Sequence, residues 1–360
     1  MPCFAVCDNR GDMNTESSFA AELIAWQHTH GRHDLPWQRT RDGYRIWVSE
    51  IMLQQTQVST VIPYYARFMG RFPDVATLAA APLDDVLAHW SGLGYYSRAR
   101  NLHAASVRLV TEHGGRFPQD IEAVTALPGI GRSTAAAILV FTYGARHAIL
   151  DGNVKRVLAR CYGIQGYAGE SAVAAKLWQT AEALLPHEDI EAYTQGLMDL
   201  GATLCVRRAP ACTACPLRGR CVAHASGRVA ELPTPRPKKT VPHRHTTLLI
   251  LVQEDRVLLE KRPAPGIWGG LWCFPESDDE AAMAGLVTQR YGVDVTHDTP
   301  MSPVEHGFTH YRLTIRPRLL RVVAHRAQVE EPGRRWFTLA EARDAGLPAP
   351  VRRILQQLPE

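Results

Sequence analysis

Four cysteines fall within 17 residues of this chain. Cys205, Cys212, Cys215 and Cys221 are separated by six, two and five residues. Loops this short bring four thiolates to the corners of one tetrahedron at little entropic cost. From the residues alone, the site is either structural zinc or a [4Fe-4S] cluster, because both accept four cysteine sulfurs. In either case, we expect this stretch to be a loop wrapped around a metal group.

The other cysteines share no such spacing. Cys3, Cys7, Cys161 and Cys273 are scattered, and we expect them to be small apolar filler or exposed thiols. No apolar run approaches the roughly 18–20 residues of a membrane span, and the first residues lack the basic-then-apolar pattern of a secretory signal. We therefore expect a cytosolic protein without a membrane partner, in which thiols stay reduced.

Composition excludes several classes of protein. The 360 residues are 46% hydrophobic and 21% charged, which is typical of a globular protein and excludes disordered, collagen-like and coiled-coil chains. The length suffices for two cores. The net charge of +4 is too small to demand a nucleic-acid partner.

The apolar pattern divides the chain into an all-α part and an α+β part. After a tail at 1–16, residues 17–225 show the three-to-four-residue apolar spacing of helices. Residues 226–246 carry four prolines and several basic residues, which is typical of a linker. Residues 247–360 mix strand and helix patterns. We therefore predict a multidomain fold.

The α+β part opens with a hairpin pattern. Residues 247–253 and 256–261 are rich in Leu, Ile and Val and flank a turn at Glu254-Asp255. Further along, we expect a helix over 280–291, a strand over 311–323 and a short helix beginning near Thr338.

A glycine turn lies between two helical stretches of the all-α part. Residues 127–133 read Leu-Pro-Gly-Ile-Gly-Arg-Ser. Gly129 and Gly131 allow strained dihedrals and expose backbone N–H groups at the start of the next helix, where the dipole favours an anion. From the residues alone, this stretch is either a plain turn between two helices or a helix-hairpin-helix turn whose backbone N–H groups bind a DNA phosphate, with Arg132 and Ser133 beside it. About 20 residues later, Asp151 stands at or near a helix start.

The hairpin, the Asp151 segment and the cysteine cluster resemble, in order and spacing, the endonuclease III superfamily of DNA glycosylases, and within it the MutY-type adenine glycosylases. The similarity extends over nearly the whole chain from about Ser17. The resemblance implies that the four cysteines bind one structural [4Fe-4S] cluster and that the partner is double-stranded DNA. It also implies that the target adenine is mispaired with 8-oxoguanine or guanine. We expect a monomer.

The resemblance also indicates the type of reaction. Bifunctional members use a lysine directly after the hairpin's Gly-Arg to form a Schiff base, and here that position is Ser133. A serine cannot form an imine, so a monofunctional glycosylase is implied. Lys155 lies nearby and is expected to be a phosphate contact or a solvated side chain.

Two carboxylates carry the implied chemistry. Glu50, within the stretch 47–57 that we predict to be helical, has apolar neighbours that disfavour its charged form. Glu50 would protonate adenine at N7 and later assist the water, whereas Asp151 would remain ionised beside the oxocarbenium ion. Asn153 resembles a partner of this catalytic end.

Further positions match residues of the family that contact DNA or base. Gln55, next to Gln54, resembles the residue that fills the vacated base stack, and Tyr95 resembles the aromatic intercalated beside the oxidised guanine. Trp37 and Gln195 resemble residues that line the adenine pocket. A mispair lowers the cost of flipping the adenine out of the stack, which contributes to selectivity.

The α+β part resembles a Nudix domain. Residues 261–276 resemble the stretch that leads into the Nudix box, but the following helix lacks the carboxylates that bind the catalytic metal. We therefore expect a Nudix-like fold without hydrolase activity. The family recognises 8-oxoguanine with a loop ending in Phe-Ser-His, and this chain has Phe308-Thr309-His310.

Three alternatives stay open at this stage. The first is a pyrimidine-directed glycosylase with lyase activity, and Ser133 argues against it. The second is a Nudix pyrophosphohydrolase fused to a DNA-binding module, and the missing carboxylates argue against it. The third is a lesion-binding protein without activity, and Glu50 and Asp151 argue against it. We expect the arginines beside the cysteine cluster, Arg132 and the linker's basic residues to form the track that contacts DNA phosphates.

Overall fold

The computed structural model describes residues 18–237, 240–264, 266–277, 283–308, 310–325 and 333–358. The chain forms two compact units, and each combines segments distant in sequence. The first unit contains residues up to His33 and Tyr143–Arg236; the second contains Asp34–Thr142 and Pro237–Glu360. None of the described helices is both long and apolar enough to cross a membrane.

The described part of the first unit is helical, with one isolated bridge between Tyr167 and Thr234. Helix α11 packs on both α1 and α9, and the close approach of α1 is possible because residue 196 is Gly: a Cβ there would lie 3.1 Å from Cγ of Leu23. The helices of this unit are α1 (Phe19–His30), α9 (Gly152–Cys161), α10 (Ser171–Ala183), α11 (Ile190–Thr203), the 3-10 turns η1 (Cys212–Ala214) and η2 (Arg218–Arg220), and α12 (Val222–Ala225).

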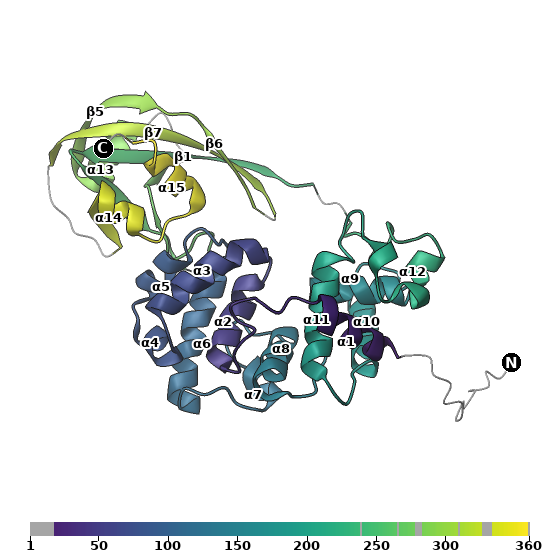
Figure 1. Ribbon diagram of the computed structural model, residues 1–360. Coiled ribbons are helices and arrows are strands. Elements are labelled where there is room, and N and C mark those ends of the chain that lie inside the picture. The colour runs from purple at the N-terminus through teal and green to yellow at the C-terminus, as the bar shows by residue number, and fades with distance from the viewer. Residues whose placement is uncertain are drawn as a thin grey trace, which may run out of the picture. The chain divides into compact units, whose positions relative to one another are not determined.

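The second unit begins with a group of helices from α2 to α8 (Figure 1). The rings of Trp47, Phe68 and Trp90 are fully buried among them. Asp42 caps α2 through a hydrogen bond from the backbone N–H of Tyr44, and Asp74 and Asp120 cap α4 and α7 in the same way. These helices are α2 (Gly43–Leu53), α3 (Val58–Arg71), α4 (Val75–Ala80), α5 (Leu83–Trp90), α6 (Ser97–His113), α7 (Ile121–Thr125) and α8 (Arg132–Tyr143).

The rest of the second unit is a mixed sheet in the order β3-β2-β1-β7-β5, with β4, β6 and β8 paired at its sides. Strand β1 pairs parallel with β7, and the other pairings are antiparallel. The strands are β1 (His243–Gln253), β2 (Arg256–Lys261), β3 (Trp272–Cys273), β4 (Glu276–Ser277), β5 (Val293–Pro300), β6 (Val304–Gly307), β7 (Arg312–His325) and β8 (Arg334–Thr338).

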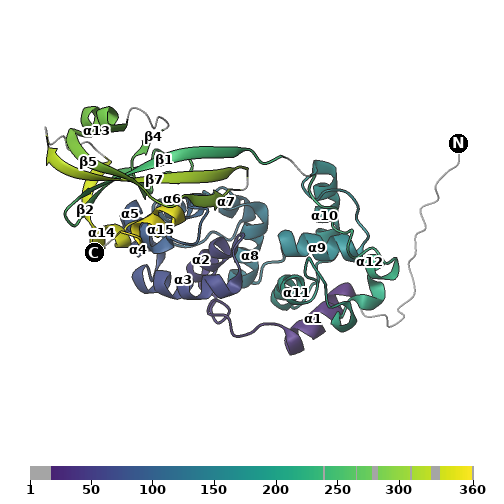
Figure 2. The same cartoon turned by 90° about the horizontal axis from the view of Figure 1, so that it is seen from above.

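Helices cover both faces of this sheet. Leu248 and Ile250 of β1 face the core formed with α14 (Leu339–Asp344) and α15 (Ala349–Leu355). Leu249 and Leu251 alternate to the opposite face, which packs on α13 (Met283–Tyr291). Figure 2 shows α13 on one side of the sheet and α14 and α15 on the other.

The predicted elements are confirmed apart from their limits. The hairpin at Glu254-Asp255, the strand over 311–323 and the helix after Thr338 are present, with Thr338 in a capping box with Glu341. The predicted linker is too long, because β1 begins at His243, where it pairs with Arg312 of β7. The helix predicted over 280–291 is described from Met283 onward.

Loops and helix α15 of the α+β part dock on the ends of α5 and α6 within the second unit. The Ser91 and Tyr96 hydroxyls both donate to the carbonyl of Leu347, at 2.9 and 3.1 Å. Arg352 donates to Ser91 Oγ at 2.9 Å, and Arg100 donates to the carbonyl of Gly269 at 2.6 Å. Residues 34–142 thus pack with residues 237–360, whereas the pattern of the sequence groups them only with the helical part.

Candidate active site

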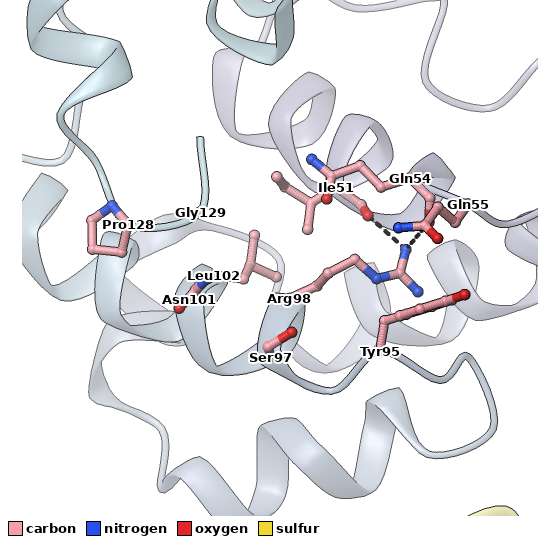
Figure 3. Close-up of a pocket in the computed structure, with 10 residues that line it drawn as sticks. All are labelled: Ile51, Gln54, Gln55, Tyr95, Ser97, Arg98, Asn101, Leu102, Pro128 and Gly129. Carbon is pink, nitrogen blue, oxygen red and sulfur yellow. Dashed lines mark hydrogen bonds between the residues drawn. The ribbon is translucent and has the colours of Figure 1, made fainter. Parts of the chain in front are cut away.

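One pocket of the second unit gathers residues from three segments. It lies where α2 ends, α6 begins and the 127–133 hairpin turns, as Figure 3 shows. Its lining comprises Ile51, Gln54, Gln55, Tyr95, Ser97, Arg98, Asn101, Leu102, Pro128 and Gly129. The structure therefore brings four predicted site residues together: Gln54, Gln55, Tyr95 and Gly129.

Two residues of this pocket have left-handed backbones. The φ angles of Gln55 and Tyr95 are 57° and 47°, and both side chains are exposed. A non-glycine residue in this region costs about 1–3 kcal/mol, and such strain is concentrated at functional sites. Both exposed side chains were predicted to enter the DNA base stack.

The prediction of a helix over 47–57 is wrong at its end. Helix α2 stops at Leu53, and Gln54–Gln57 form a turn. A residue with the φ angle of Gln55 cannot continue a right-handed helix. Gln55 therefore lies in the turn after α2 and not on the helix.

The hairpin follows α7 and leads into α8, as predicted. Gly129 has a φ of 76°, and a Cβ there would lie 2.6 Å from Cβ of Asn101. Gly131 was expected to be strained as well, but its φ is outside the left-handed region and a Cβ would meet nothing within 4 Å. Only Gly129 therefore requires glycine.

The start of α8 carries the other hairpin residues. Arg132 is exposed and Ser133 is half-buried at its first two positions. Gln54 Nε2 donates to the hydroxyl of Thr134, the third residue of α8, at 3.3 Å. The bond fastens the end of α2 to the helix that follows the hairpin.

Glu50 lies in the last turn of α2. Its side chain is half-buried between neighbours that are buried, Ser49 and Ile51. Ile46 and Trp47, the apolar residues four and three positions earlier that the prediction rests on, are buried as well, and the strained Gln55 follows five positions later.

Asp151 lies in the first unit, at the N-cap of α9. Its Oδ1 accepts from the backbone N–H of Val154 at 2.8 Å and its Oδ2 from Nδ2 of Asn153 at 3.3 Å. Burial raises the pKa of Asp151, while these donors and the Arg156 guanidinium lower it. Donors to both carboxylate oxygens favour an ionised group at the positive end of a helix.

The four predicted ligand cysteines line one cavity of the first unit. Cys205, Cys212, Cys215 and Cys221 surround it together with apolar residues of α9 and α11. In the described part of the chain, no three or more His, Cys, Asp or Glu side chains form a site for a single metal ion. Four thiols around an apolar cavity fit the donor set of a [4Fe-4S] cluster.

Cys161 is buried, as expected of small apolar filler, but its place beside the four cysteines was not foreseen. It lines the same cavity, and a hydrogen bond from its thiol lowers the pKa of Cys221 to about 6. Burial instead raises the pKa of the predicted ligands Cys205 and Cys215. Cys273 is buried filler as predicted, whereas Cys3 and Cys7 lie outside the described residues.

Two arginines that sequence reasoning missed support the cysteine loop. Arg160, 2% exposed, donates to the carbonyls of Cys205, Val206 and Leu232 and to Sγ of Cys205. Arg156 connects Asn153 Oδ1 to the carbonyl of Cys205 at 2.8 and 2.7 Å. In the sequence, each is recognisable only as a basic side chain at a position where an amphipathic helix is expected to be buried.

The predicted pocket residues Trp37 and Gln195 lie in different units. Trp37 is buried and packs edge-on against Tyr65, with ring centroids 5.3 Å apart. Gln195 on α11 donates to Oδ1 of the buried Asp199 at 2.8 Å. Arg32 also binds Asp199 through its backbone N–H and its Nε. The Arg32–Asp199–Gln195 network was not foreseen.

The predicted 8-oxoguanine loop is an aromatic cluster on the sheet. Phe308 packs on Tyr311, His306 and Trp268, with ring centroids 4.5, 4.6 and 5.3 Å apart. His310 is exposed beside Tyr311. Thr309 lies outside the described residues.

The described helix α13 carries no carboxylate along Met283–Tyr291. Glu276, the acid nearest before it among the described residues, is paired with Arg262 at 2.6 Å.

The arginines beside the cysteines differ in their surroundings. Arg220 pairs with Glu22 at 2.9 Å, whereas Arg207 and Arg208 are exposed.

Comparison with known proteins places these features in two families. Residues 48–183 match the family described as HhH-GPD superfamily base excision DNA repair protein. Residues 246–357 match the NUDIX domain family. The first match includes the strained pocket, the hairpin and Asp151, and the second includes the sheet.

Relatives extend over nearly the whole chain. An adenine DNA glycosylase of Buchnera aphidicola subsp. Acyrthosiphon pisum is 38% identical over 95% of this chain and 98% of its own length. The human adenine DNA glycosylase is 31% identical over 96% of this chain and 74% of its own length. A thermostable thymine-DNA glycosylase of known structure is 30% identical with a TM-score of 0.53, over 58% of this chain and 95% of that one.

Proposed function

The chain belongs to the family of adenine DNA glycosylases of base excision repair, and on that premise we propose that it removes adenine paired with 8-oxoguanine or guanine in duplex DNA. The reaction is hydrolysis of the N-glycosidic bond without strand cleavage. The chain works as a monomer in the cytosol.

Glu50 and Asp151 divide the chemistry. Glu50 protonates N7 of the flipped adenine, so that the base leaves as a neutral molecule when the bond to the sugar breaks. Asp151 stays ionised and stabilises the positive charge that develops on the sugar. Water then adds to the sugar carbon with Glu50 accepting its proton, and Asn153 orients Asp151.

The observation that carries this proposal is the pocket of Gln55 and Tyr95. Two exposed side chains held in left-handed turns face a glycine hairpin, and Glu50 lies one turn earlier on α2. An enzyme that flips a base out of the duplex needs exposed side chains to fill the vacated space, close to a turn that binds the phosphate backbone. Trp37 and Gln195 would contact the adenine.

The remaining parts support this site. Residues 17–225 form the catalytic domain, and Cys205, Cys212, Cys215 and Cys221 bind a structural [4Fe-4S] cluster. Arg132 and the backbone of Gly129 and Gly131 bind phosphate, together with Ser133. The α+β part, which begins with β1 at His243, recognises 8-oxoguanine through Phe308, Thr309 and His310.

The test is release of free adenine from duplexes that differ only in the base opposite the adenine: 8-oxoguanine, guanine or thymine. We expect release from the first two under single-turnover conditions and little from the third. Equal rates on all three duplexes would contradict the specificity. Strand breaks formed as fast as adenine is released would contradict monofunctional chemistry.

A further inference from the structure

The two strained residues of the pocket share one support. The peptide bond before Gln55 begins at the carbonyl of Gln54, and the one before Tyr95 begins at the carbonyl of Gly94. Arg98 donates to both carbonyls, through Nη1 to Gln54 at 2.6 Å and through Nη2 to Gly94 at 3.2 Å. One guanidinium therefore fixes the orientation of both peptide groups. Figure 3 shows Arg98 reaching the end of α2, where it binds the carbonyls of Ile51 and Gln54.

The other bonds of Arg98 fasten the surrounding turns. Nη1 also donates to the carbonyls of Ile51 and Met52, each at 2.9 Å, which the end of α2 leaves without helical partners. Nη2 also donates to the carbonyl of Leu93 and the hydroxyl of Thr56, each at 3.3 Å. The side chain thus connects the turn after α2 with the turn before α6.

The site is suited to arginine. The guanidinium is planar and carries its donors in a fixed fork, whereas a lysine offers one point charge. Arg98 is 8% exposed and stands over the rings of Trp90 and Tyr95, at 5.3 and 5.6 Å from their centroids. Burial lowers the pKa of Arg98 to about 10, so the cation persists at neutral pH.

We propose that Arg98 is a positioning residue that sets Gln55 and Tyr95, as a pair, at the separation with which Gln55 fills the vacated position of the base stack and Tyr95 intercalates beside the oxidised guanine. The inference rests on the proposed function, in which these two side chains act on DNA. Arg98 itself reaches the DNA only through them. Without the guanidinium of Arg98, the backbones of Gln55 and Tyr95 leave the left-handed region independently of each other.

A purely structural helix cap would also explain the bonds to Ile51 and Met52. That role predicts a loss of thermal stability and an equal loss of activity whether or not Gln55 and Tyr95 are present. The positioning role predicts that the loss depends on those two side chains. A double-mutant cycle separates the two roles.

The experiment compares Arg98→Lys and Arg98→Met with wild type and with Arg108→Met. Arg108 lies on the same helix, is half-buried, pairs with Glu112 and donates to the carbonyl of Ala126, so it controls for loss of an α6 arginine that binds a backbone carbonyl away from Gln55 and Tyr95. The probe is 2-aminopurine placed in the duplex opposite 8-oxoguanine, whose fluorescence rises when the base leaves the stack. Adenine release is measured in parallel, and melting temperature reports folding.

We expect Arg98→Lys and Arg98→Met to reduce flipping and single-turnover release by about 10²-fold, the loss that a misplacement of 1 Å can cause. Arg108→Met should match wild type. In a Gln55→Ala/Tyr95→Ala background, Arg98→Lys should change flipping by no more than about twofold. Arg98→Lys alone carries the test if Arg98→Met does not fold.

An equal loss in both backgrounds would overturn the proposal, as would wild-type flipping by Arg98→Lys. Because the fluorescence signal requires no bond cleavage, a wild-type protein that flips 2-aminopurine but releases no adenine would overturn the proposed function and still test Arg98.

Discussion

Asp151 is subject to two opposing effects. Burial raises its pKa, and its hydrogen-bond donors, Asn153 among them, lower it. In the proposed mechanism the carboxylate must be ionised, so activity falls as the pH drops through the pKa that Asp151 has in the folded protein. Removing a donor raises that pKa further.

We therefore expect Asn153→Ala to shift the acidic limb of the rate profile to higher pH. The measurement is the single-turnover rate of adenine release across the acid range. At pH 8, where Asp151 is ionised in both proteins, the variant should approach the wild-type rate more closely than at pH 5. An acidic limb at the wild-type position would contradict the role of Asn153.

Ser133 determines whether the enzyme cleaves the strand. It is half-buried at the second position of α8, after the hairpin. A lysine there supplies the amine that a Schiff base requires. We expect Ser133→Lys to form a complex with DNA that borohydride traps and to nick the strand, which wild type should not do. Ser171→Lys, on the exposed start of α10, is the control.

At the scale of elements, the two glycines of the hairpin differ in how well they would tolerate a side chain. An alanine at Gly129 would have a positive φ and its Cβ would clash with Asn101, whereas one at Gly131 would meet open space. We expect Gly129→Ala to lower the free energy of unfolding by about 1–3 kcal/mol and to weaken DNA binding. Gly131→Ala should stay within about 0.5 kcal/mol of wild type.

Thermal unfolding and a DNA titration measure both effects. Equal losses of stability in the two variants would show that the turn does not depend on the backbone of Gly129.

The sequence predicted this element well and its neighbour less well. The limits of the hairpin follow from local chemistry, since Pro and Gly interrupt the helices on either side. The end of α2 at Leu53 does not, because the residues 54–57 that follow contain no Gly or Pro to interrupt a helix, and the helix ends through the left-handed backbone of Gln55. The carbonyls freed there are bound by Arg98, which is distant in sequence.

The same reason explains the other missed features. Arg156 and Arg160 donate largely to backbone carbonyls about 45 residues away, and backbone acceptors leave no trace in a sequence pattern. Strand β1 begins before the predicted limit because its first residues pair with β7. The cysteine cluster, by contrast, was predictable because its spacing is local.

At the scale of the whole molecule, the α+β part packs on α5 and α6. Leu347, between α14 and α15, contributes a carbonyl that both Ser91 and Tyr96 bind. If the α+β part recognises 8-oxoguanine as proposed, this contact fixes it to α6, the helix that follows Tyr95. A buried acceptor left without donors costs about 1–3 kcal/mol.

We therefore expect the Ser91→Ala/Tyr96→Phe double variant to lose preference for 8-oxoguanine over guanine opposite the adenine, with a smaller effect on the slower reaction at guanine. The ratio of single-turnover rates on the two duplexes is the measurement. Ser171→Ala should leave the ratio unchanged. A ratio unchanged in the double variant would mean that docking of the α+β part does not contribute to recognition.

The central claim is that Glu50 supplies the proton that lets adenine leave. The most direct measurement is single-turnover release of adenine opposite 8-oxoguanine by wild type and Glu50→Gln, with Glu112→Gln on the exposed face of α6 as control. Glutamine preserves the shape of the side chain but cannot act as an acid, so we predict a loss of at least about 10²-fold with DNA affinity retained. Release by Glu50→Gln at the wild-type rate would contradict the account.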